Sequence, residues 1–81
     1  MINKLPKVKH LVITFETMTM AIYMDRLCSQ KNISGRTIPV PKEIDVGCGS
    51  AFASTNLDEN FWIDFMKENN VKYKQITILD I

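Results

Sequence analysis

The stretch Val8–Phe15, "VKHLVITF", decides the fold because its hydrophobic side chains alternate with a period of two. One face carries Leu11, Ile13 and Phe15, and the other carries His10, Val12 and Thr14. This alternation and the β-branched content predict a β-strand. We place this strand at the centre of a sheet.

The next residues, 17–32, change to helical spacing. The apolar positions that would face a core are Met20, Ala21, Met24, Leu27 and Cys28. Thr17 is the predicted N-cap, since its hydroxyl can accept from a free backbone N–H of the first turn. Asn32 is the predicted helix end, because asparagine tolerates the left-handed conformation, and Ile33 would close the turn.

The second half of the chain repeats strand and helix signals. Residues 35–40, "GRTIPV", predict a short strand at a sheet edge, because Pro39 and Pro41 cannot donate to a ladder. Residues 50–55 predict a third strand, residues 56–70 a second helix and residues 71–81 a last strand. Asn56 and Glu59 form the predicted capping pair of this helix. Its expected buried stripe is Leu57, Phe61, Trp62 and Phe65.

The order βαββαβ predicts an α+β fold, a ferredoxin-like split βαβ sandwich. Both helices would cover one face of a four-stranded antiparallel sheet. The opposite face, which carries His10, Val12, Thr14 and also Tyr73 and Thr77, would be open or would meet a partner. We expect residues 1–81 to form a single domain, with residues 1–7 as a flexible N-terminal tail.

Composition narrows the functional classes. The formal net charge is +1, and the basic residues are scattered, so no nucleic-acid-binding face is predicted. No segment reaches the length of a membrane span, and none reads as a signal peptide. We therefore expect a cytoplasmic protein whose two cysteines stay reduced.

The two cysteines have different contexts. Cys28 lies on the apolar stripe of the first helix and is expected to pack as a small hydrophobic side chain. No periodicity buries Cys48, and Gly47 and Gly49 leave its sulfur sterically open. The backbone N–H groups of residues 47–50, from Gly47 to Ser50, could stabilise a Cys48 thiolate. The acidic Glu43 and Asp45 oppose this, because negative charge nearby raises a thiol pKa.

Other chemistry is not indicated by the residues. No C-x-x-C pair or other metal-ligand spacing is present, so we predict no metal site and no cofactor. Met20 and Met24 of the first helix are explained as core residues, and the lone His10 as a surface imidazole. No catalytic base is evident beside Cys48, so a carrier or binding role is favoured over an enzyme.

The segment from Phe15 through "IPVPKEIDVGCG" resembles a family of small bacterial domains named for selenium and sulfur carriers. The family pattern is F-x-T, a helix, P-V-P-(R/K)-x-I, a short spacer and Cys-Gly. The matching positions here are Phe15, Thr17, Pro39, Val40, Pro41, Lys42, Ile44, Cys48 and Gly49. The likeness extends from about His10 to Ile78.

This resemblance implies that Cys48 accepts sulfur or selenium as a persulfide or selenosulfide. The implied partners are a cysteine desulfurase or a selenium- or sulfur-utilising enzyme, and Lys42 would guide docking or offset the acidic neighbours. The alternative is a non-enzymatic interaction or regulatory module. In that case the open sheet face would form a homodimer or bind a partner.

Overall fold

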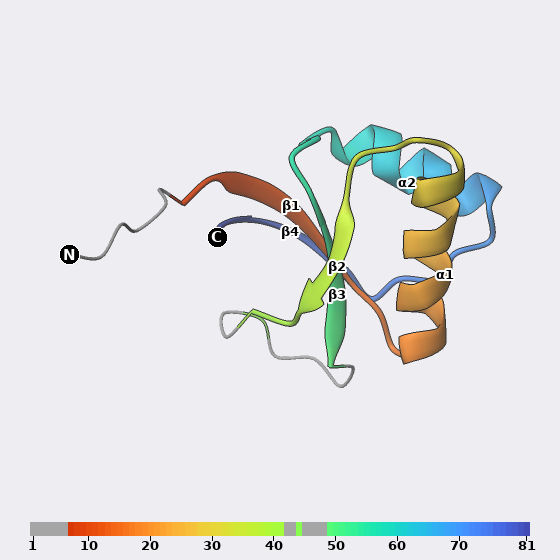
Figure 1. Cartoon of the computed structure of the whole chain (residues 1–81), viewed down its shortest axis with the longest axis horizontal. Helices are drawn as coiled ribbons and strands as arrows, with labels where there is room; N and C mark the ends of the chain where they lie inside the picture. Colours follow the sequence, from red (N-terminus) through yellow and green to blue (C-terminus); the bar gives the residue numbers. More distant parts are fainter. Residues whose placement is uncertain (1–6, 42–43, 45–48) are drawn as a thin grey trace.

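A computed structural model describes residues 7–41, 44 and 49–81. The elements along the chain are β1 (Lys9–Thr14), α1 (Met18–Gln30), β2 (Arg36–Pro39), β3 (Ser50–Ser54), α2 (Glu59–Glu68) and β4 (Gln75–Asp80). The strands form one sheet in the order β2-β3-β1-β4, and all neighbouring strands are antiparallel. This is the predicted ferredoxin-like order, with β1 central and β2 at an edge (Figure 1). Of the tail predicted over residues 1–7, only Lys7 lies within the described residues.

The main core fills the space between the sheet and both helices, which confirms that the helices share one face. Leu11, Ile13 and Phe15 project from β1 and its end into this core, as their alternation predicted. Trp62 of α2 lies at its centre, with its ring edge-on to Phe52 at a centroid separation of 5.6 Å. The indole Nε1 donates to the Asn56 carbonyl oxygen at 2.8 Å, so this large side chain is buried without leaving a polar atom unpaired.

Both helices end in the same hydrogen-bonded turn. Asn32 and Asn70 each adopt a left-handed φ of 57°. The next residue then donates its N–H back across the turn, from Ile33 to the Cys28 carbonyl and from Val71 to the Met66 carbonyl, both at 2.8 Å. This is the Schellman pattern predicted at Asn32. The predicted cap at the other end of α1 is also confirmed, because the Thr17 hydroxyl accepts from the Met20 N–H.

The start of α2 differs from the prediction. Asp58, not Asn56, is the N-cap, and its carboxylate accepts from the Phe61 N–H at 3.2 Å. Asn56 instead accepts from the Asp58 N–H one turn earlier. Leu57 therefore precedes the helix, where helical periodicity no longer applies. Leu57 and Phe61 are both 37% exposed, and the stripe buried by α2 is Trp62, Phe65 and Met66.

The second face of the sheet is also more covered than predicted. Val12 and Thr14 are completely buried, so this face is not open at its centre. A smaller apolar cluster forms there, made by Val12, Ala51 and Ala53 together with Ile44 from the connection between β2 and β3. Tyr73 precedes β4 and is exposed, and Thr77 is half-buried.

Gly35 and Gly49 form a matched pair for testing backbone packing. Gly35 has a φ of +155°, and a Cβ there would overlap the buried Phe52 ring. We expect Gly35→Ala to lower the free energy of unfolding by more than about 2 kcal/mol, because both the backbone and the ring resist displacement. A Cβ at Gly49 would meet none of the described atoms within 4 Å, so Gly49→Ala should change stability by less than about 1 kcal/mol. Urea denaturation of both variants measures the difference, and equal stabilities would contradict it.

Candidate functional site

The predicted site lies in the connection between β2 and β3. Lys42, Gly47 and Cys48 fall outside the described residues, whereas Gly49 and Ser50 are described. The geometry of the site therefore comes from the two ends of the connection and from Ile44.

The two ends of this connection meet at the edge of the sheet. Pro39 pairs with Ser50, and the Val40 N–H donates to the Gly49 carbonyl oxygen at 3.4 Å, which continues the ladder beyond β2. Gly49 is exposed, and Ser50, half-buried, begins β3. Gly49, which directly follows Cys48 in the chain, is therefore attached to the sheet through its carbonyl group. None of the described atoms lies within 4 Å of the position that a Cβ of residue 49 would take.

Ile44 anchors the middle of the same connection to the sheet. Its N–H donates to the Pro41 carbonyl oxygen at 3.0 Å, and its side chain is only 7% exposed. The side chain belongs to the apolar cluster of the second face, together with Val12, Ala51 and Ala53. Burying an aliphatic side chain of this size stabilises the packed arrangement by about 1.5–3 kcal/mol. Sequence reasoning treated Ile44 only as a motif position, since a lone apolar residue in a loop carries no periodicity.

Cys28 is confirmed as a structural cysteine. Its side chain is 1% exposed and belongs to the main core. Burial, with a smaller contribution from the nearby Asp25 carboxylate, raises its pKa to about 11, so the thiol is uncharged at neutral pH. It lies near the end of α1, and Figure 1 shows this last turn and the start of β3 at opposite ends of the sheet.

His10 lies at the other end of the sheet from Gly49. It precedes Leu11, which pairs with Ser54 at the end of β3, whereas Gly49 precedes the first residue of β3. The two ends of β3, Ser50 and Ser54, are four residue steps apart, which is roughly 13 Å along an extended strand. The structure thus gives no reason to assign His10 as a base acting at the β2–β3 connection, in agreement with the sequence interpretation.

Two negative observations apply to the described residues. Within residues 7–41, 44 and 49–81, no three His, Cys, Asp or Glu side chains gather in a way that could hold a metal ion. In the same part of the chain, neither helix has the length and apolar content needed to cross a bilayer.

Together, the fold and the connection define a small ferredoxin-like α+β domain whose β2–β3 connection ends in a Cys-Gly pair. A family model described as "Putative Se/S carrier protein-like" matches residues 10–78. The chain belongs to this family, as the motif resemblance predicted. No curated protein and no solved structure matches the chain.

The contrast between the cysteines predicts selective alkylation. Iodoacetamide at pH 8 should modify Cys48 in the folded protein and leave Cys28 unmodified, because a buried thiol with a pKa of about 11 offers little thiolate and no access. Both cysteines should react in denaturant. Peptide mass spectrometry after each treatment measures the modified fractions, and rapid native modification of Cys28 would contradict the assignment.

Proposed function

We propose that the protein carries sulfur or selenium on Cys48 as a persulfide or selenosulfide. Membership of the Se/S carrier-like family over residues 10–78 is the observation that supports this most. The chain has two cysteines, and Cys28 is sealed in the core. Only Cys48 is then left to exchange an atom with another protein.

The proposed loading step conserves electrons. The Cys48 thiolate attacks the terminal sulfur of a persulfide on a donor protein, and a new S–S bond forms at Cys48. The S–S bond of the donor breaks, and the donor cysteine leaves as a thiolate with that electron pair. Unloading is the same displacement on an acceptor, with Cys48 as the leaving thiolate. A selenium atom in the terminal position would follow the same steps.

Such a carrier needs little more than an accessible thiol and a surface for docking. The open surroundings of Gly49 support access, because the described atoms leave the approach to this flank free. In the proposal Gly47 keeps the other flank small, the N–H groups of residues 47–50 support the thiolate, and Lys42 attracts an acidic partner. The proposed partners are a cysteine desulfurase as donor and a selenium- or sulfur-utilising enzyme as acceptor. The cytoplasm suits this chemistry, because thiols stay reduced there.

The alternative, an interaction module that uses the second face of the sheet, has less support. The face expected to meet a partner included Val12 and Thr14, and both are completely buried within the chain itself. A homodimer through this face would therefore have to rely on the margins of the face.

Incubation with a cysteine desulfurase and cysteine tests the carrier proposal directly. Intact-protein mass spectrometry should show a gain of one sulfur atom that is removed by a thiol reductant. Cys28→Ala should load as the parent protein does, whereas Cys48→Ser should not load. Loading of Cys48→Ser, or no loading of the parent beside a known acceptor that loads normally, would contradict the proposal.

Gly49→Val tests whether the open flank matters for transfer. A branched side chain next to Cys48 should hinder the approach of a donor persulfide, and we expect the loading rate to fall about tenfold or more, as misplacement of reacting groups commonly does. The position is exposed, so the midpoint of thermal unfolding should change little. Mass spectrometry of samples quenched at successive times gives the loading rate. An unchanged rate in the folded variant would show that access does not depend on this glycine.

A further inference from the structure

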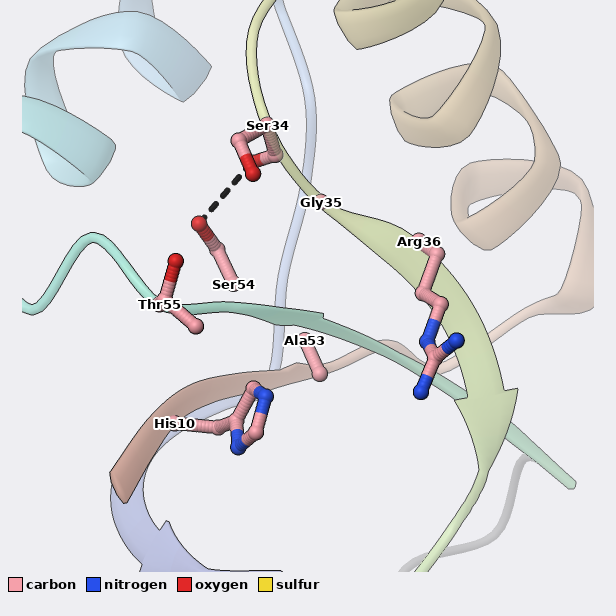
Figure 2. Close-up of a pocket in the computed structure, with 7 residues that line it drawn as sticks. All are labelled: His10, Ser34, Gly35, Arg36, Ala53, Ser54 and Thr55. Atoms are coloured by element: carbon pink, nitrogen blue, oxygen red, sulfur yellow. Dashed lines mark hydrogen bonds between the residues drawn. The ribbon is translucent and has the colours of Figure 1, made fainter. Parts of the chain in front are cut away.

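A surface hollow of about 260 Å³ lies at the end of the sheet away from Gly49. Its walls come from β1, β2 and the end of β3, and its polar side chains include those of His10, Arg36 and Thr55. Figure 2 shows the imidazole of His10 and the guanidinium of Arg36 on either side of Ala53. Neither the family motif nor the carrier chemistry uses any of these residues.

The strand register places Arg36 in this hollow. Arg36 lies directly opposite Ala53, and Ala53 belongs to the cluster on the second face of the sheet. Side chains at paired positions share a face, so the guanidinium projects over the same face. Arg36 is exposed, so its five N–H donors are accessible to a ligand in solution.

The ring of His10 is oriented by the backbone. The Nδ1 atom of His10 lies 2.8 Å from the Val8 carbonyl oxygen. A carbonyl oxygen only accepts, so Nδ1 is the protonated nitrogen and Nε2 is left for a ligand. Protonation of the ring then turns Nε2 into a donor. The described cross-strand neighbour of His10 on β4 is the uncharged Leu79, and Ala53 and Thr55 of the β3 side carry no charge.

A buried serine fixes the rim of the hollow. The Ser54 hydroxyl is 2% exposed, donates to the Ser34 carbonyl oxygen at 2.8 Å and accepts from the Asn56 N–H at 3.1 Å. This bridge holds the segment before β2 against the end of β3, as the dashed line in Figure 2 shows for Ser34 and Ser54. The backbone of Arg36, two residues after Ser34, is thereby fixed at the rim of the hollow that His10 also lines.

We propose that this hollow binds a small oxyanion, a group in which two or more oxygen atoms share a negative charge. The guanidinium of Arg36 supplies two parallel N–H donors, and Nε2 of the His10 ring supplies a third when the ring is protonated. Planar guanidinium groups match carboxylate and phosphate-like groups in this way. The site is at the opposite end of the sheet from Gly49, so its occupancy is separate from the thiol chemistry.

Nuclear magnetic resonance titration of the whole chain tests the site. Sodium acetate and sodium sulfate are the probes, with sodium chloride at matched ionic strength as the control. Saturable shifts of the Arg36 Nε–H and His10 ring signals are expected for at least one probe, with tighter binding as the pH is lowered, because a protonated imidazole adds a donor and a positive charge. Tighter acetate binding identifies a carboxylate ligand, and tighter sulfate binding a tetrahedral oxyanion.

Single substitutions localise the binding. Arg36→Gln and His10→Gln should each weaken binding of the preferred probe about tenfold or more, the usual effect of losing a hydrogen bond to a charged group. Arg26→Gln, which removes an exposed arginine from α1, and Cys48→Ser should leave the affinity unchanged. Shifts that do not saturate, shifts reproduced by chloride, or an Arg36→Gln affinity equal to that of the parent would each overturn the proposal.

Discussion

Burial of β1 on both faces is the constraint on which the rest of the structure depends. Leu11, Val12 and Ile13 are all completely buried, although they point alternately to opposite sides. A strand of this kind needs a layer on each face, because an apolar surface left in water costs about 25 cal/mol per Å². The helices supply one layer around Trp62. The smaller cluster supplies the other, and Ile44 of the β2–β3 connection packs there together with Ile38, Val40, Leu79 and Ile81.

This constraint couples the candidate site to the core. Ile44 belongs to the same ten-residue connection, 40–49, that carries Cys48, and it packs in the cluster that contains Val12 of the central strand. Farther along, Gly49 is held to Val40 by a backbone hydrogen bond. The connection is therefore attached to the sheet at its middle and at its end. Under the proposed function this connection meets two demands, because it covers the core through Ile44 and carries Cys48.

Most of the fold could be predicted because it depends on local signals. The alternation in β1 identified its two faces, and the asparagines after each helix marked the turns that end them. The errors occurred where two local signals competed or where none existed. Asn56 and Asp58 are both suitable N-cap residues. In the structure Asp58 caps the helix, and Asn56 accepts from the Asp58 N–H in the turn before it. For the second face, periodicity showed that Val12 points there but not that Ile44 of the β2–β3 connection helps to cover it.

The candidate site was harder to predict than the fold because it depends on contacts between distant segments. The sequence predicted a buried Cys28 and an accessible Cys48, and the burial of Cys28 confirms the first of these predictions. No signal in the sequence indicated the pairing of Arg36 with Ala53, which sets a guanidinium over the same hollow that a histidine from another strand lines. The register of β2 on β3 thus has two consequences at once. Its Pro39 end brings Gly49 to the sheet edge, and its Arg36 end builds the polar hollow, so one short edge strand positions groups at both ends of the domain.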